Sequence, residues 1–403
     1  MFPACVPGVL INNRKEMVVY MELTNENRMI EKEQRLKKID KMMAEQGLDA
    51  VLFCSTAQPA FKVLVKYVTA APLSTRRAFV FKEYGKEPDV FFQMAVDKKS
   101  YVNPSWIDID NVHLGNMLPA VLGFIDRLPS PKPRIGWANL EEMPHGVYMT
   151  LTGSKAEFVD ITKEFVKLRS NKSEYEIALT KLASDLAVGS FEEIIRTIGV
   201  GKTERELIGG AIGYLAQRGA EDLLILTQSK KPFAFIKAPK DVPVGETDIF
   251  VYSAEFAGPG GYWTQLIRPV FMDKKSHPDA YDVWQVALEA ERAAAEVIRP
   301  GNLLCDIHNA IEAVIKKNGM EMSYWAGHGM GCDLGDDVVI GAEIKMEIEP
   351  NMVLTLQPSV ESPTNSLLYG NTFLSVENGD PINLTGKYMD SPYYEDLYDI
   401  ICG

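Results

Sequence analysis

Short apolar runs recur through the first 160 residues, and their spacing is the feature that most limits what this chain can fold into. The runs are rich in Val, Phe and Ile and are separated by polar or helical stretches. Runs of this length suit strands, and strands that alternate with helical patterns are typical of an α/β domain. We therefore predict such a domain, with strands at Ala50–Cys54, Arg77–Phe81, Asp89–Gln93, Ile135–Trp137 and Phe158–Ile161.

A second pattern begins after the polar segment Leu168–Glu174. Two helices are predicted, then strand-like runs, and then the order of helices before strands repeats. The second helix opens with Thr203 and Glu206 at the spacing of a capping box. The expected elements are helices at Glu174–Thr197 and Thr203–Gln217, and strands at Leu223–Leu226, at Asp248–Ser253 and ending at Phe271.

The length of 403 residues agrees with two domains, because one hydrophobic core seldom serves so long a chain. We predict an α+β protein in three parts. These are an N-terminal extension over residues 1–30, a small α/β domain over 31–167 and a larger two-lobed domain over 168–403.

The charge and the cysteines exclude several kinds of function. With 42 Lys and Arg against 55 Asp and Glu, the formal charge of −13 repels nucleic acid and anionic membranes. No apolar run approaches the roughly 18–20 residues of a membrane helix. The five cysteines include no Cys-x-x-Cys pair, which argues against a disulfide framework and a zinc site. Without a recognisable signal peptide, we predict a cytoplasmic protein with no nucleic-acid or membrane partner.

Four motifs occur in the order and spacing of one superfamily. They are Leu168–Ile177, Gly261–Arg268, Gly327–Gly331 and Ile348–Val353. With these motifs, the chain resembles the creatinase, prolidase and methionine aminopeptidase superfamily, from about residue 30 to its end. The resemblance implies a "pita-bread" domain from about Leu168, preceded by a smaller creatinase-type α/β domain. It also implies a homodimer in which the small domain of one subunit helps to close the active site of the other.

The metal ligands of this superfamily are largely replaced. Its peptidases hold two metal ions with two Asp, one His and two Glu. Of these, only His328 is kept. An imidazole and neutral amides offer little negative charge to a hard or borderline cation, so we assign no metal and no cofactor. The replaced positions fall on Ser253 or Ala254, on Gln265, on Gln357 and near Gly370 or Asn371.

Two residues are candidates for catalysis. His328 lies between glycines in the third motif, and we predict that it donates a proton or a hydrogen bond to the substrate. Lys237 falls where creatinase has its proton-shuttling His, and it follows the apolar run Phe233–Ile236, which would desolvate its amine. The alternative for Lys237 is an ordinary surface lysine.

Six further residues are candidates for substrate binding. Gln265 and Gln357 keep hydrogen-bonding capacity without charge. Arg268 would clamp a substrate carboxylate or, alternatively, support the sheet. Because strand side chains alternate, one of two adjacent aromatic residues would face the cavity. The six are Glu255, Tyr262, Trp263, Gln265, Arg268 and Gln357.

Creatinase is the branch that works without metal, and the motif Gly261–Arg268 resembles its corresponding strand. The leading hypothesis is therefore a metal-independent, creatinase-like hydrolase. Its substrate would be a small polar molecule, such as an amidino compound, a cyclic amidine or an N-alkyl amino acid, cleaved at a C–N bond. One alternative is a catalytically silent pita-bread module that binds a peptide or small ligand. Another is a metal-dependent Xaa-Pro peptidase, against which the missing carboxylates count.

The acidic end of the chain, Tyr388–Asp399, contains four tyrosines among its carboxylates. We predict a solvated tail there, with an edge or dimer contact as the alternative.

Overall fold

The computed structural model describes residues 24–58, 61–71, 73, 76–94, 105–140, 143–336 and 338–403. These residues divide into two compact units, one ending at Arg169 and the other beginning at Ser170. That boundary lies two residues beyond the one expected. Most of the expected extension over residues 1–30 lies outside the described residues, and its last residues open the first helix.

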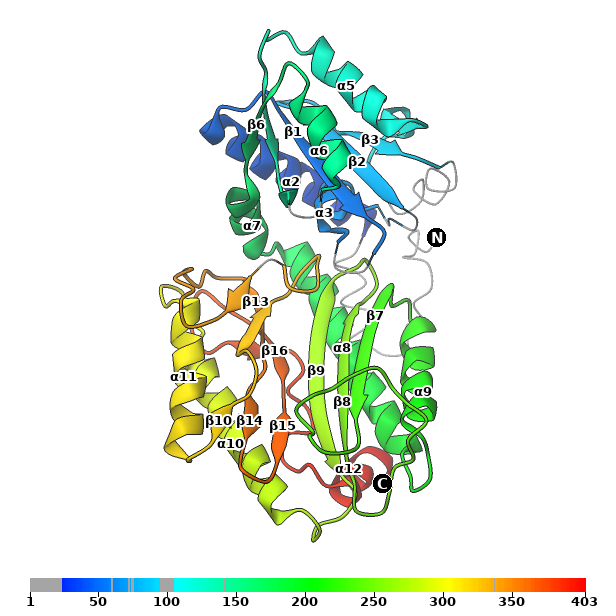
Figure 1. The fold of residues 1–403 in the computed structure, drawn as a ribbon, viewed down its shortest axis with the longest axis vertical. Helices are drawn as coiled ribbons and strands as arrows, with labels where there is room; N and C mark the ends of the chain where they lie inside the picture. Colours follow the sequence, from blue (N-terminus) through cyan, green and yellow to red (C-terminus); the bar gives the residue numbers. More distant parts are fainter. Residues whose placement is uncertain are drawn as a thin grey trace. The chain divides into compact units, whose positions relative to one another are not determined.

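The first unit is a mixed six-stranded sheet with helices packed on it, in the strand order β4-β3-β2-β1-β5-β6 (Figure 1). β1 pairs antiparallel with β2 and parallel with β5. Its strands are β1 (Ala50–Thr56), β2 (Arg77–Glu83), β3 (Asp89–Phe92), β4 (Val112–Leu114), β5 (Arg134–Trp137) and β6 (Glu157–Asp160). Its helices are α2 (Asn25–Gln46), α3 (Val63–Thr69), α5 (Met117–Arg127), α6 (His145–Thr152) and α7 (Thr162–Ser170), with a 3₁₀ turn at Ile109–Asn111.

Side-chain alternation lets both faces of this sheet carry a core. Phe79 and Phe81 of β2 lie in one cluster with Val121 and Ile125 of α5. Phe53 of β1 instead meets the ring of Phe165 in α7, at a centroid distance of 4.5 Å. Four of the predicted strands, β1, β2, β3 and β5, are therefore largely buried, as expected of strands covered by helices, whereas the edge strand β6 is not.

The second unit repeats an order of two helices followed by strands. The first half comprises α8 (Glu174–Thr197), α9 (Glu204–Ala216), β7 (Asp222–Gln228), β8 (Ile249–Ala257) and β9 (Trp263–Phe271). The second half begins with α10 (Pro278–Val297) and α11 (Leu304–Lys317). The strands that follow are β10 (Glu321–Met322), β11 (Gly327–Gly329), β12 (Val339–Ile340), β13 (Val353–Leu356), β14 (Ser359–Glu361), β15 (Ser366–Leu368), β16 (Asn371–Leu374) and β17 (Ile382–Asn383).

Three sheets form this unit, and two of them meet along β9. They run β7-β8-β9, β12-β11-β13-β16-β17 and β10-β14-β15. The backbone of Ile267 in β9 pairs with Gly370, just ahead of β16, with an N···O distance of 3.0 Å. β9 therefore lies beside β16 although about a hundred residues of chain separate them, as Figure 1 shows.

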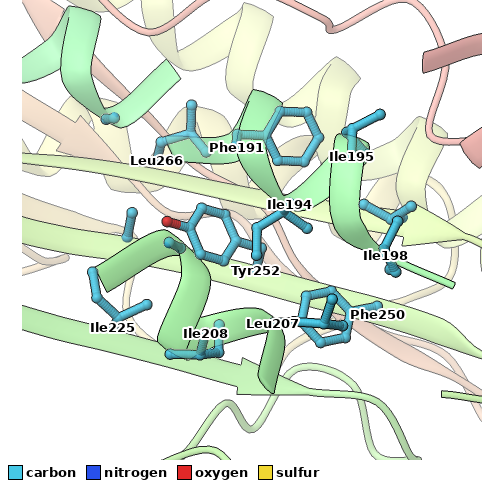
Figure 2. Close-up of a cluster of buried hydrophobic side chains, with 14 of the residues drawn as sticks. Phe191, Ile194, Ile195, Ile198, Leu207, Ile208, Ile225, Phe250, Tyr252 and Leu266 are labelled. Carbon is cyan, nitrogen blue, oxygen red and sulfur yellow. The ribbon is translucent and has the colours of Figure 1, made fainter. Parts of the chain in front are cut away.

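One face of the β7-β8-β9 sheet is covered by α8 and α9. Figure 2 shows Phe191 and Ile194 of α8 packed against Tyr252 of β8 and Leu266 of β9. Burying each such side chain contributes ~1.5–3 kcal/mol relative to leaving it exposed. At the start of α9, Thr203 and Glu206 form the predicted capping box. The capping box stabilises the start of α9, and the apolar core between the two helices and the sheet stabilises the positions of β8 and β9.

The prediction of a solvated acidic tail is wrong. The chain ends in a helix, α12 (Tyr394–Cys402), whose Leu397 is 1% exposed and belongs to the core under α8. The Tyr388 hydroxyl donates to Glu192 Oε1 at 2.6 Å. The carboxylates face outward, and the apolar side chains between them bury one face of the helix.

The predicted α+β class, with a small α/β domain followed by a larger two-lobed domain, is confirmed. In the described part of the chain, no helix combines the length and the apolar character needed to span a membrane.

Candidate active site

A buried polar cluster lies where the sheets of the second unit meet. We call it the amide–imidazole cluster, and it consists of Glu255, Gln265, His328, Thr355 and Gln357. Each of the five residues is at most 8% exposed. Protein interiors consist mostly of apolar side chains. Polar side chains are buried there when they form hydrogen bonds with one another or with a ligand.

Strand register brings Glu255 and Gln265 together on the first sheet. The two residues are direct partners in the antiparallel pair of β8 and β9. Opposite residues in such a pair lie on the same face, with Cβ atoms about 4.5–5.5 Å apart. The carboxylate and the amide therefore point to the same side of the sheet.

His328 and Thr355 are paired in the same way on the second sheet, in β11 and β13. Gln357 follows Thr355 by two residues and so shares its face. Gly327 makes the close pairing possible, because its φ is +143° and a Cβ there would lie 2.0 Å from the carbonyl oxygen of Thr355. This close approach is a physical reason for a glycine immediately before the histidine.

Direct contacts join the two sheets through the cluster. The Gln357 amide nitrogen donates to Gln265 Oε1, and the Thr355 hydroxyl donates to the same oxygen at 2.9 Å. The Gln357 amide also lies 3.3 Å from His328 Nε2, and that nitrogen is 3.3 Å from Glu255 Oε1. Four of the sequence-predicted site residues are thus brought into one contact network.

Two acceptor atoms in this network lack a hydrogen-bond donor. They are Glu255 Oε1 and Gln357 Oε1, and both atoms are inaccessible to solvent. An unsatisfied buried acceptor costs about 1–3 kcal/mol, and more if it is charged. Unpaired acceptors of this kind in a cluster beside an imidazole are typical of a functional site.

Thr355 and Trp325 are site residues that the sequence analysis missed. The ring of Trp325 lies 5.1 Å from that of His328, and the ring of Tyr324 is 5.7 Å from that of Trp325. Unlike the cluster, Trp325 is 41% exposed and Tyr324 is 56% exposed. Two features of the sequence could have indicated these residues. An aromatic pair lies just before the Gly-His-Gly motif, and Thr355 lies two positions before Gln357, so the two side chains share one face of the strand.

Arg268 is positioned on the other face of β9, where it supports the sheet. Its guanidinium donates to the backbone oxygens of Ile267 and Gly370 at 2.9 and 3.0 Å. It also donates to the Asn371 side chain at 2.6 Å and to the carbonyl of Thr385 at 2.8 Å. These bonds tie β9 to the strand region around β16, which is the alternative that the sequence left open for this residue.

The two adjacent aromatic residues have structural partners. The Tyr262 hydroxyl donates to Glu176 Oε1 at 2.8 Å, and Glu176 is part of the capping box that begins α8. Trp263 packs with Met330 and Val353 in an apolar cluster.

The desolvation expected for Lys237 is absent. Its side chain is exposed, and the neighbouring Phe235 is 48% exposed. Its backbone pairs with Thr227 at the edge of β7, so the segment is held by main-chain hydrogen bonds and the side chain remains in water. The apolar run before Lys237 therefore does not surround its amine.

A second buried carboxyl group lies close to Arg268. Glu291 of α10 is fully buried and accepts from the Asn371 amide with both oxygens, each at 2.9 Å. Desolvation raises the pKa of Glu291 to about 7, against the opposing effects of the Arg268 charge and the Asn371 hydrogen bond. Because of this shift, Glu291 titrates near neutral pH.

Replacing Glu291 with glutamine is expected to remove a pH dependence of stability. Between about pH 4.5 and 7, the folded protein holds a proton that the unfolded chain has released, so stability falls as pH rises through that window. A pKa shift of this size corresponds to about 3 kcal/mol of stability lost as the pH rises. Glu291→Gln should not show this loss, because its amide does not titrate. Thermal melting of both proteins at pH 5 and pH 8 measures the effect, with Glu296→Gln, exposed on the same helix, as control. Identical pH profiles for wild type and Glu291→Gln would contradict it.

Comparison with known proteins gives the family context of this site. Residues 178–381 match the sequence profile described as metallopeptidase family M24. The chain is 21% identical over 359 residues to the Xaa-Pro dipeptidase of Pyrococcus horikoshii, an alignment that covers 86% of this chain and 95% of that protein. It is 23% identical over 232 residues to the Xaa-Pro dipeptidase of Pyrococcus furiosus, covering 55% of this chain and 65% of that protein, slightly under two thirds of its length.

The structural comparison supports the same fold. The crystal structure of the prolidase from Pyrococcus horikoshii OT3 matches with a TM-score of 0.74 at 19% identity, over 87% of this chain and 98% of that chain. The family match over residues 178–381 confirms the predicted superfamily.

The prediction of a creatinase-type hydrolase of amidino compounds is wrong. The relatives found along the chain carry the names Xaa-Pro dipeptidase and prolidase. That prediction gave most weight to a few replaced site positions, whereas the similarity is spread over nearly the whole chain. The expectation of a hydrolase agrees with these relatives, which are all peptidases.

The cluster does not fit the metal centre that the family description implies. It offers one imidazole, one carboxylate and neutral amide and hydroxyl groups, whereas adjacent cations need several carboxylates between them. Across the described residues, no three His, Cys, Asp or Glu side chains come together in a group that could hold a metal ion. We therefore derive no chemical step through a metal.

Proposed function

Because the chain belongs to metallopeptidase family M24, we propose that it hydrolyses small peptides of the Xaa-Pro class. The observation that carries the proposal is the contact between His328 Nε2 and Glu255 Oε1, at 3.3 Å, inside a family-type fold. A buried imidazole beside a carboxylate is a general acid–base pair that needs no third ionisable group. The names of the Pyrococcus relatives supply the substrate class.

The proposed chemistry is water attack on the peptide carbonyl. His328 Nδ1 lies 2.9 Å from the Gly329 carbonyl oxygen, which places the ring proton on Nδ1 and the lone pair on Nε2. Nε2 takes a proton as the water oxygen bonds to the carbonyl carbon, and Glu255 stabilises the imidazolium. The proton then passes to the leaving nitrogen as the C–N bond breaks. The amides of Gln265 and Gln357 orient the substrate through hydrogen bonds.

Three further properties are part of the proposal. The enzyme works without a metal ion, because the amide–imidazole cluster offers one carboxylate, too few to hold adjacent cations. It acts as a homodimer, and it resides in the cytoplasm. The small-molecule substrate reaches the cluster past Trp325, whose ring is partly exposed.

A silent binding module is the second candidate, and one observation favours it. The side-chain amides of Gln265 and Gln357 form a hydrogen bond with each other. Part of the hydrogen-bonding capacity expected to hold a substrate is therefore used within the protein. In this case the site would bind the same peptides and leave them intact.

A panel of Ala-Pro, Leu-Pro and Met-Pro, with Ala-Ala as a control peptide, tests the proposal. We expect release of free proline from the first three, at a rate unchanged by exhaustive chelation or by added Mn²⁺ or Co²⁺. Calorimetry on the same peptides detects binding. Binding without proline release would establish the silent module, and strong activation by a metal would overturn metal independence.

A further inference from the structure

An open cavity lies in the first unit, between α5 and the edge strand β4. Its volume is about 630 Å³, which is within the usual range of small-molecule sites. We propose that this cavity binds a small aromatic carboxylate, whose ring stacks beside His113 and whose carboxylate accepts hydrogen bonds from Arg127. The cavity and the amide–imidazole cluster are made of different residues, in different units, so this binding does not depend on the proposed hydrolysis.

A row of aromatic rings crosses the sheet and ends at the cavity. Strand register places Phe79 of β2 opposite Phe91 of β3, and Phe91 opposite His113 of β4. The His113 ring stacks on that of Phe91, with a centroid distance of 4.9 Å. Both phenylalanines are buried, whereas the side chain of His113 is 34% exposed. Because β4 is the last strand in the order of this sheet, the row stops at His113, where a ligand ring would continue it.

Phe124 of α5 forms a second aromatic wall of the cavity. Its ring meets those of Phe91 and His113 at steep angles, with centroid distances of 5.0 and 5.3 Å. His113 Nε2 contacts Asp89 Oδ1 at 2.6 Å, which fixes the orientation of the imidazole. Core packing and this contact therefore hold the aromatic surfaces in place before a ligand arrives, which lowers the entropic cost of binding.

Arg127 supplies the positive charge of the cavity. Its guanidinium carbon lies 3.8 Å from the centroid of the Phe124 ring, and the residue is exposed. Among the described residues, no Asp or Glu forms an ion pair with Arg127. A guanidinium stacked on a ring keeps its N–H groups available in the planar fork that matches a carboxylate.

Other classes of ligand fit this cavity less well. A cation would be repelled by Arg127, and a neutral apolar molecule would leave its guanidinium without an acceptor. A polyanion such as a nucleotide would find one guanidinium beside two carboxylates, those of Asp89 and of the exposed Asp126. A single negative charge on an aromatic body matches both the guanidinium and the rings.

Three matched probes test the proposal on the full chain. They are 3-phenylpropionate, 3-phenylpropanamide, which lacks the charge, and butyrate, which lacks the ring. Ligand-detected NMR titrations at pH 7 are expected to show 3-phenylpropionate binding about 10-fold more tightly than either of the others, the effect of one charge-assisted contact or one stacked ring. Arg127→Gln should remove the preference over the amide, and its exposed position makes misfolding no concern.

Gly123→Leu tests where the probes bind. Gly123 is exposed on α5 and lines the cavity, and a Cβ there would meet no atom within 4 Å. A leucine side chain would therefore occupy the cavity without a clash and would favour the helix, so binding should be lost while the melting temperature does not fall. Gly209→Leu is the control, because Gly209 is an equally unobstructed, exposed glycine on α9.

Several outcomes would overturn the proposal. One is equal affinity of the wild type for the three probes, and another is no binding of 3-phenylpropionate at ~10 mM. A third is wild-type affinity for 3-phenylpropionate in either Arg127→Gln or Gly123→Leu. These titrations involve no Xaa-Pro peptide, so they give the same result whether or not the protein is a hydrolase.

Discussion

Turnover of an Xaa-Pro peptide should fall by about 10² to 10⁴ in His328→Ala, the usual effect of losing a positioned acid or base. The physical reason is that Nε2 of His328 is the one basic nitrogen in the amide–imidazole cluster. His328→Gln keeps a hydrogen-bonding side chain of similar reach but cannot carry a proton. Binding should therefore persist in His328→Gln while turnover stays low, which is the pattern of a lost transition-state interaction.

Proline release and calorimetry on both variants measure these effects, with thermal melting to verify folding. His277→Ala is a suitable control, because that imidazole contacts the Thr247 carbonyl at an exposed position. If turnover in His328→Ala equals that of wild type, proton transfer takes place elsewhere and the proposed mechanism fails.

The Arg268→Met variant is expected to lose about 3–5 kcal/mol of stability, the range seen when a buried charged partner is removed. The loss would remove the Arg268 donor from the Thr385 carbonyl. It would leave the Gly370 carbonyl with the Ile267 N–H and the Asn371 side-chain oxygen with the Thr385 hydroxyl as donors. It would also take away the positive charge that partly offsets the burial of Glu291. Arg268→Lys should recover only part of the stability, because an ammonium lacks the fork that reaches these separate oxygens.

Denaturant unfolding of Arg268→Met measures this loss, and Arg292→Met, an exposed change on α10, is the control. The variant should bind the Xaa-Pro peptides normally at temperatures where it is folded. Wild-type stability combined with a weakened affinity for peptides would show instead that Arg268 holds a substrate carboxylate.

Local sequence signals were sufficient for much of the helical framework. The helix Glu174–Thr197 was predicted with the bounds that the structure has, and Thr203 and Glu206 form the predicted capping box. Such signals succeed because a cap is made within four residues of chain. The C-terminal helix was missed because its carboxylates suggested a solvated tail, although the few apolar residues between them, Leu397 in particular, bury one face.

Several site residues were also predictable, since the family positions pointed to Gln265, His328 and Gln357, and Glu255 lies next to the replaced position at Ser253 or Ala254. Their roles were harder to predict. The sequence could not distinguish the buried, bonded guanidinium of Arg268 from the exposed amine of Lys237, because burial depends on which strands lie alongside. Trp325 drew no attention because its significance lies in a ring contact with His328, three residues further along the chain.

The sequence by itself determined the two-domain plan, the family resemblance and the presence of glutamine at positions 265 and 357, because each of these depends on residue identity and spacing along the chain. The tertiary structure alone decided which groups touch. Gln265 and Gln357 are 92 residues apart, and they meet because β9 of one sheet lies against β13 and β16 of another. Contacts between separate sheets depend on how helices pack and where glycines allow close approach, and no local pattern encodes them.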